Sequence, residues 1–241
     1  MKLNKSYWYA STFMVLEQKQ LSIYIIIIIK MLAVIDKPKW YTSFDVIKKL
    51  KRLYPKIKIW HSWTLDPMAT GILLIGIDKS TKILGSLQEL DKEYIAEIDF
   101  AKDSDTWDMD FWNFLRQYHF DANHIYINDK EIKIPQISEI KTKLDMLLPH
   151  YILPLPDFSA KKVGGKKLYD LARTGKSLNI SRPMDIYEYK ILDYTFPVLK
   201  IRFKVWSGTY IRSIAYRLGK QFEMGGILKS LKRTKIWDYW F

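Results

Sequence analysis

The sequence predicts an α+β protein in which strands and helices alternate without an internal repeat. Three observations lead to this fold class. Of the 241 residues, 48% are hydrophobic, which is enough to bury a sizeable core in one large domain. Apolar residues follow helical spacing in some segments and form strand-like runs in others. No Ser/Thr/Pro-rich linker separates two independent domains.

The expected elements follow one another from about residue 31 onward. Short apolar runs and one alternating segment predict strands at residues 32–36, 71–77, 93–100 and 199–206. Apolar residues at helical spacing predict helices at residues 44–54, 140–151, 165–176 and 209–220. The first helix is expected to bury the stripe Phe44, Ile47, Leu50 and Leu53. Gly175 and Gly219 are expected to close the third and fourth helices.

Residues 1–30 differ from the rest of the chain. Their apolar run ends in five isoleucines, far short of the roughly 18 apolar residues that a membrane helix needs. The order of charges and the absence of a cleavage site do not fit a signal peptide. We therefore expect no membrane span. The change of pattern at Met31 indicates that translation starts there and that residues 1–30 are a non-native extension; an added strand or a disordered tail is the alternative.

The composition favours a polyanionic partner. The net charge is +13 and 15% of the residues are aromatic, so the chain can attract phosphates and stack on bases. Nucleic acid is the first candidate. Because the lysines are scattered along the chain, a generally basic protein without a nucleic-acid partner is the alternative.

Cysteine is absent, which excludes disulfides, thiolate nucleophiles and cysteine-ligated zinc. The four histidines form no ligand cluster. His119 and His124 lie five residues apart around Asp121, which matches one face of a helix poorly. We therefore expect no metal site.

Two segments carry residues suited to chemistry. "HSWTLDPMATG", residues 61–71, places Asp66 in a proline-stiffened turn before a strand, a common position for a catalytic side chain. The alternative is a turn whose carboxylate only caps backbone amides. "SGTYIRSIAYRLGK", residues 207–220, brings Tyr210 and Arg212 together near a helix start. These residue types stack on a base and bind an anion, but on a helix they are as often core and surface residues.

Seven ordered blocks carry a family resemblance: "DKPxxxTS", "HSxTLDPMATG", "KxY" at 92–94, "SDTxD" at 104–108, "FSAKKxxGKKLYDLARTG" at 158–175, "GTYIR" at 208–212 and "LKRT" at 231–234. In this order they resemble the bacterial tRNA pseudouridine synthases of the TruB type, which modify uridine 55 in the T loop. The match runs from about Met31 to the C-terminus. The "MATG" continuation looks more like the stand-alone tRNA enzymes than the guide-RNA-directed branch.

The resemblance implies a mixed, mostly antiparallel central sheet flanked by helices, with the catalytic cleft in its middle. It implies an isomerase that uses no cofactor, binds the T stem-loop of tRNA, and works as a monomer in the cytoplasm. Residues 31–241 would form the catalytic domain, and the small C-terminal RNA-binding appendage of many relatives would be absent. A non-catalytic tRNA-binding or tRNA-folding protein, or a pseudouridine synthase acting on another RNA, are the alternatives.

The resemblance also implies roles for individual residues. Asp66 would be the nucleophile, attacking either C1′ or the base. Tyr94 would stack on the uracil, and Arg212 would pair with Asp66. His61 would contact the displaced nucleotide, with Tyr210 and Leu231 lining the uridine pocket. Six cations are expected to contact RNA: Lys37, Lys82, Lys161, Lys166, Arg173 and Arg233. Leu153 and Leu155 depart from the glutamine and paired prolines usual before "FSA".

Six tryptophans form the main departure from the family: Trp40, Trp60, Trp63, Trp107, Trp206 and Trp237. The family has glycine at the first three positions, and glycine would be ordinary at the others. The chain has only 10 glycines, whereas average usage corresponds to roughly 17 in a chain of this length. We infer that the gene comes from a lineage that reads UGA as glycine. The alternative is that real tryptophans are tolerated at these positions.

Overall fold

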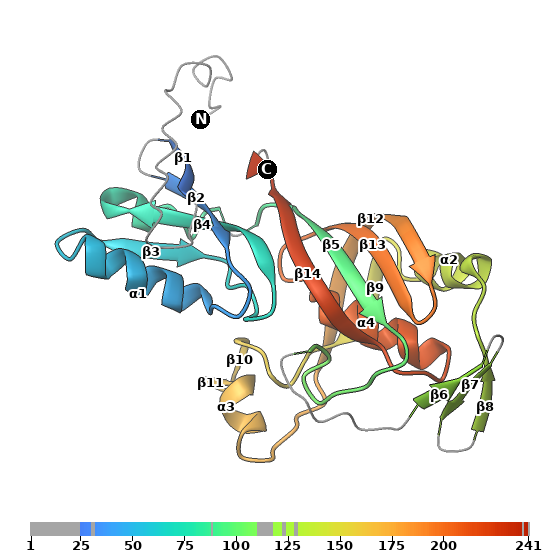
Figure 1. The fold of residues 1–241 in the computed structure, drawn as a ribbon. Helices are drawn as coiled ribbons and strands as arrows, with labels where there is room; N and C mark the ends of the chain where they lie inside the picture. Colours follow the sequence, from blue (N-terminus) through green and yellow to red (C-terminus); the bar gives the residue numbers. More distant parts are fainter. Residues whose placement is uncertain are drawn as a thin grey trace. The chain divides into compact units, whose positions relative to one another are not determined.

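The computed structural model describes residues 25–29, 32–87, 89–109, 118–121, 124–127, 130–237 and 239–240 (Figure 1). The chain forms two compact units: residues 1–89 with 238–241, the N-terminal unit, and residues 90–237, the C-terminal unit. The boundary falls inside the span predicted to be one catalytic domain. The predicted start at Met31 and most of the predicted extension lie outside the described residues.

The N-terminal unit is an antiparallel sheet covered by one helix. Its strands, in the spatial order β1–β2–β4–β3, are β1 (Ile25–Ile29), β2 (Leu32–Lys37), β4 (Thr70–Ile77) and β3 (Ile59–Ser62). Helix α1 (Ser43–Leu53) packs Val46, Ile47 and Leu50 into a core with side chains of β2, β3 and β4. A short 3-10 helix, η2 (Asp78–Lys82), follows β4.

The ends of α1 follow from its local sequence. Thr42 accepts a hydrogen bond from the Asp45 amide, and the Asp45 carboxylate accepts one from the Thr42 amide, which forms a capping box. The helix ends at Leu53, two residues before Pro55. The predicted helix is confirmed, but its predicted apolar stripe was partly wrong. Phe44 and Leu53 are 46% and 44% exposed, because the sheet lies against the face that carries Val46.

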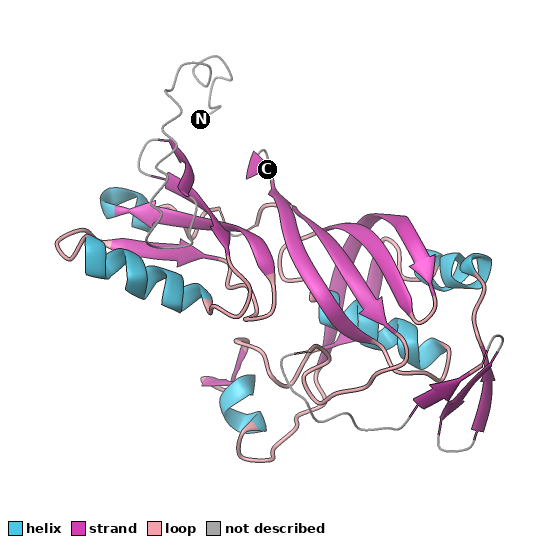
Figure 2. Ribbon diagram, in the orientation of Figure 1, coloured by secondary structure: helices cyan, strands magenta, loops and turns pink. Residues whose placement is uncertain are grey.

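The C-terminal unit is built on a five-stranded antiparallel sheet (Figure 2). Its strands, in spatial order, are β14 (Ile227–Ile236), β5 (Lys92–Asp99), β13 (Val198–Val205), β12 (Ser181–Thr195) and β9 (His150–Pro154). Helix α4 (Ile211–Gln221) contacts β14, β9 and helix α2 (Ile137–Asp145). Buried apolar residues of β5, β13 and α4 contribute to the core of this unit.

Smaller elements complete the description. A three-stranded sheet contains β6 (Tyr118–Phe120), β7 (His124–Ile127) and β8 (Lys130–Lys133). A hairpin of β10 (Lys162–Val163) and β11 (Lys166–Lys167) leads into α3 (Leu168–Ala172), and β15 (Tyr239–Trp240) lies near the C-terminus. Asp108 and Leu228 form a parallel bridge. The predicted α+β class with a mostly antiparallel sheet is confirmed.

Three predicted helices have different bounds in the structure. The segment 140–151 is helical only to Asp145, and β9 begins at His150, because Pro149 cannot continue a helix. The segment 165–176 begins as a hairpin that turns at Gly164 and Gly165, both at positive φ, which leaves only five helical residues. Gly175, at φ +73°, follows the end of this helix as predicted.

Helix α4 runs past its predicted end at Gly219 and ends at Gln221. Gly219 serves close packing instead, since a Cβ there would lie 2.1 Å from the Gly225 carbonyl oxygen. Among the helices that the structure describes, none is long and apolar enough to cross a membrane.

Candidate active site

Asp66 lies in a turn whose neighbours are held by hydrogen bonds from two directions. The Leu65 amide donates to the hydroxyl of Ser43, in the first turn of α1, at 2.9 Å. The Trp40 amide donates to the Pro67 carbonyl at 2.8 Å. Leu65 is buried, whereas Asp66 itself is half-buried. The turn therefore holds one partly exposed carboxylate on a fixed backbone, as a positioned nucleophile requires.

Lys37 holds the same turn from the end of β2. Its ammonium donates to the carbonyl oxygens of Pro38, Tyr41 and Pro67, at 3.0, 2.6 and 3.1 Å. The residue is 0% exposed. This burial corrects the expectation that Lys37 contacts RNA, because a covered ammonium bound to three carbonyls is not available to a phosphate. Lys37 instead connects the end of β2 to the residue that follows Asp66.

His61 lies on β3, five residues before Asp66. Its ring stacks on that of Trp60, with centroids 5.6 Å apart and planes at 14°. Trp60 is 48% exposed and also meets Phe44 edge-on, at 6.3 Å between centroids. The N-terminal unit thus places His61 and Asp66 on neighbouring segments, a strand and the turn that follows it.

Tyr94 and Leu231 share one face of the sheet in the C-terminal unit. Tyr94 on β5 pairs with Phe203 on β13 and with Arg233 on β14. Leu231 pairs with Ala96, two residues beyond Tyr94, and residues two apart on a strand point to the same face. Tyr94 and Leu231 are 8% and 6% exposed. The structure therefore brings together these two predicted uridine-binding residues.

Arg233 was expected to contact RNA, and its burial corrects that expectation. The residue is 1% exposed and lies across from Tyr94 in the sheet. A guanidinium covered in this way is not available to an RNA phosphate. Four other predicted RNA contacts do lie on the surface: Lys82, Lys161, Lys166 and Arg173. Of these, Arg173 lies over the ring of Tyr169, at 4.3 Å from its centroid.

Arg212 is held in the interior of the C-terminal unit. It lies in the first turn of α4 and is 3% exposed. Nη1 lies 3.3 Å from a carboxylate oxygen of Asp108 and donates to the Thr106 carbonyl at 2.9 Å. Nη2 donates to the Phe158 carbonyl at 3.1 Å. Asp108 is 1% exposed and accepts a further hydrogen bond from the Thr106 hydroxyl at 2.6 Å.

Tyr210 begins the same helix, in the N-cap position, and is half-buried. Tyr210 and Arg212 are thus placed by one helix start. The predicted pairing of Arg212 with Asp66 joins residues of the two units and stays a prediction. Within the C-terminal unit, Arg212 pairs with the buried carboxylate of Asp108.

Lys92 is a buried lysine on β5, two residues before Tyr94. It is 4% exposed, and its ammonium donates to the Leu90 carbonyl at 2.6 Å. Burial, and then the nearby guanidinium of Arg233, lower the pKa of Lys92 from 10.5 to about 7, against the opposing charge of Asp91. Lys92 and Tyr94 lie two residues apart on β5 and therefore share a face of the strand.

Replacing Lys92 by methionine is expected to change how stability depends on pH. Between pH 7 and 10 the unfolded chain binds a proton at Lys92 that the folded chain has released, so raising the pH favours the folded state. In Lys92→Met we expect the free energy of unfolding to rise less between pH 7 and 10 than in the parent. At pH 7 it should exceed that of the parent by an amount on the order of 1 kcal/mol. Urea unfolding at pH 7 and pH 10 checks this, with exposed Lys190→Met as the control. Equal pH dependence in Lys92→Met and the parent would contradict it.

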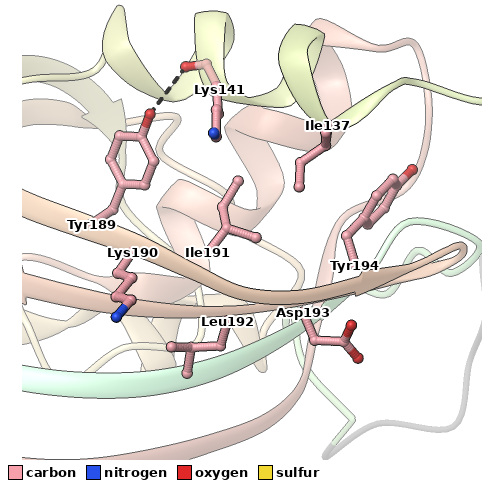
Figure 3. Close-up of a pocket in the computed structure, with 8 residues that line it drawn as sticks. All are labelled: Ile137, Lys141, Tyr189, Lys190, Ile191, Leu192, Asp193 and Tyr194. Carbon is pink, nitrogen blue, oxygen red and sulfur yellow. Dashed lines mark hydrogen bonds between the residues drawn. The ribbon is translucent and has the colours of Figure 1, made fainter.

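A surface hollow of about 520 Å³ lies between α2 and β12 (Figure 3). It is lined by Ile137, Lys141 and residues 189–194 and contains none of the predicted site residues. The Tyr189 hydroxyl donates to the Asp145 carboxylate at 2.6 Å, and the Tyr194 hydroxyl donates to the Pro135 carbonyl at 2.9 Å. These hydrogen bonds join β12 to α2 and to Pro135, two residues before the helix. We therefore interpret the hollow as a structural feature. The described residues include no group of three or more histidine and acidic side chains able to hold a metal ion.

Sequence analysis did not predict the contacts of three residues near the site. Asp108 belongs to the quoted block "SDTxD", but nothing in the sequence indicates that it faces Arg212. Lys37 belongs to "DKP", and its role depends on carbonyls up to 30 residues away. Lys92 begins "KxY", and only the pairing of β5 with β14 places it near Arg233. The only sequence signal that could have identified these three residues is their place in the blocks that resemble the family.

Solved structures share this fold. The chain matches the Cbf5–Nop10–Gar1 complex with a TM-score of 0.59 and 23% identity, over 83% of this chain and 47% of that one. It matches an H/ACA RNP bound to a substrate RNA containing 2′-deoxyuridine with a TM-score of 0.57 and 21% identity, over 83% and 45%. Identities this low concern the fold alone.

Sequence comparison makes the assignment narrower. The sequence model of the TruB family pseudouridylate synthases (N terminal domain) matches residues 51–211. A tRNA pseudouridine synthase B from Ureaplasma urealyticum is 36% identical over 229 residues, which cover 88% of this chain and 94% of the relative. One from Dehalococcoides mccartyi is 37% identical over 200 residues, which cover 83% of this chain but 62% of the relative, less than two thirds of its length. This chain belongs to the TruB family of pseudouridylate synthases.

Proposed function

We propose that this chain is an isomerase that converts uridine 55 in the T loop of tRNA to pseudouridine, with Asp66 as the nucleophile. Family membership supports the reaction class, and the turn held by Ser43, Trp40 and Lys37 supports the role of Asp66. The reaction breaks the bond from C1′ to N1, turns the uracil and forms the bond from C1′ to C5; C5 loses its proton and N1 takes up a proton. One carboxylate can carry the covalent step.

The other roles are those that the family resemblance implies. Tyr94 stacks on the uracil near its C5 proton, and Leu231, on the same sheet face, lines the pocket together with Tyr210. Arg212 pairs with Asp66 and keeps it ionised, while Asp108 sets the position of the guanidinium. His61 contacts the displaced nucleotide. In this proposal, residues 31–241 act as one catalytic domain.

RNA binding must extract a stacked base. The target uridine lies inside the folded tRNA elbow, and flipping it out costs about a few kcal/mol. Phosphate contacts offset this cost. The exposed side chains of Lys82, Lys161, Lys166 and Arg173 are suited to provide them. The protein would act as a monomer in the cytoplasm, without a cofactor.

Tritium release tests the proposal. The substrate is a T stem-loop RNA labelled at uridine C5, and the protein carries glycine at the six tryptophan positions. Release of label is expected as the C5 proton leaves. RNA binding without release would support a non-catalytic tRNA-binding protein. Release only from a different RNA would support a pseudouridine synthase with another substrate.

We further propose that the six tryptophans are glycine in the native protein, encoded by UGA. Four of them have left-handed backbone: Trp40, Trp63, Trp107 and Trp237, at φ 67°, 54°, 59° and 48°. Seven non-glycine residues of the described chain have positive φ, and these four are the majority. Left-handed backbone costs an L-residue about 1–2 kcal/mol and costs glycine little.

The surroundings of these side chains also support glycine. Trp40 and Trp237 are 52% and 50% exposed, so their indoles contribute little to a core. Their backbones nevertheless hold specific positions, since the Trp40 amide donates to Pro67 and the Trp237 amide to Asp91. These two positions therefore require the left-handed backbone conformation and do not depend on the indole side chain. For Trp60 and Trp206 the proposal rests on the family pattern and on their exposure of 48% and 38%.

Restoring glycine at the four left-handed positions is expected to raise the free energy of unfolding by about 1 kcal/mol per position. The gain at 107 is smaller, because the indole stacks on Tyr216 at 4.1 Å between centroids. Thermal unfolding of the four-site variant checks this. Trp60→Gly with Trp206→Gly is the matched control, since these positions lack positive φ and should not gain. A four-site variant no more stable than the parent, or UGG codons at these positions, would count against recoding.

A further inference from the structure

The loop between β9 and β10 holds a buried serine next to the contacts of Arg212. Ser159 is 4% exposed. Its amide donates to the Asp157 carbonyl at 3.0 Å, and its carbonyl accepts from the Tyr169 amide at 3.0 Å. The carbonyl of Phe158, one residue earlier, accepts from Arg212. The backbone of this loop is therefore well hydrogen-bonded, and it is joined directly to a proposed catalytic residue.

The Ser159 hydroxyl is the exception. Among the described residues it has no hydrogen-bond partner. The other buried serines of the described chain each donate to a backbone carbonyl: Ser43 to Leu65, Ser62 to Leu84, Ser104 to Asp108 and Ser213 to Pro154. A buried hydroxyl without a partner is unfavourable, and alanine would avoid the penalty at the same position. The hydroxyl is therefore expected to have a hydrogen-bond partner in another state of the protein.

We propose that Ser159 is a substrate-contact residue whose hydroxyl donates a hydrogen bond to an oxygen of the target uridine nucleotide when RNA binds. This inference rests on the proposed function. The uracil carbonyls and the ribose 2′-hydroxyl are suitable acceptors. Ala160 and Lys161, which follow directly, are exposed, so this side of the loop faces solvent. Because Ser159 is covered in the free chain, the loop must move outward for the contact to form.

The proposal predicts opposite effects of Ser159→Ala on stability and on activity. In the glycine-restored protein, kcat/KM for the T stem-loop should fall about fivefold to tenfold, as expected for one lost hydrogen bond. The Tm should stay the same or rise slightly, because the free protein loses no hydrogen bond. Ser213→Ala is the stability control: its hydroxyl donates to the Pro154 carbonyl at 2.5 Å, so its Tm should fall.

Two readouts separate this inference from the proposed function. A Ser159→Ala variant with unchanged kcat/KM, or with a Tm lowered as in Ser213→Ala, overturns the role of Ser159 while the parent enzyme stays active. If the parent itself releases no tritium, the proposed function fails. The Kd for the T stem-loop then decides the contact: a rise of about fivefold in Ser159→Ala supports it, and an equal Kd overturns it.

Discussion

Asp66→Asn is expected to reduce tritium release from T stem-loop RNA by at least about a thousandfold, because an amide cannot act as the covalent nucleophile. RNA affinity should remain within about twofold of the parent. Three hydrogen bonds that hold the turn use the Leu65 amide and the Pro67 carbonyl, which the substitution does not change. The turn should therefore keep its conformation. Single-turnover release and a filter-binding Kd measure the two effects.

Asp193→Asn is the matched control for this prediction. Asp193 is an exposed carboxylate on β12, so the same change of charge there should leave release unaffected. Release by Asp66→Asn at more than about a tenth of the parent rate would exclude Asp66 as the nucleophile. Loss of both release and RNA binding would indicate a damaged fold, which the Tm of the variant reveals.

Asp108→Asn is expected to lower the free energy of unfolding by about 3 kcal/mol, because it removes a buried carboxylate that pairs with the Arg212 guanidinium. Arg212 and Asp108 have side chains 4% and 1% exposed, so water cannot replace the lost partner. Turnover should also fall, since the guanidinium would no longer be held in one position. Urea unfolding and tritium release of the same preparation test both effects.

The exposed neighbour Asp105 provides the control. Asp105→Asn removes the same charge from the same loop but does not break a buried ion pair. A double variant, Asp108→Asn with Arg212→Met, should recover part of the stability but none of the activity, since the buried cation is then removed together with its carboxylate. If Asp108→Asn is as stable as Asp105→Asn, the buried ion pair does not have the role assigned to it.

Local sequence explains the limits of two helices. Thr42 and Asp45 start α1, and Pro149 stops the helical pattern that begins near Ile137, although the helix predicted from hydrophobic spacing ran through Pro149 to residue 151. Hydrophobic spacing alone did not place the boundaries of α2 and α3. The predicted stripe on α1 also failed in part, because Phe44 and Val46 are both apolar and only the position of the sheet decides which of them is buried.

The sequence by itself determined the family, the turn that carries Asp66, and the six tryptophans that stand where glycine is expected. These depend on the order of residue types along the chain. Only the tertiary structure decided which charges are covered and which partners they have. Lys37 and Arg233 proved to be buried. Arg212 meets the Asp108 carboxylate and, 106 residues away, the Thr106 carbonyl. Burial and pairing depend on packing between segments far apart in sequence, which a linear pattern does not record.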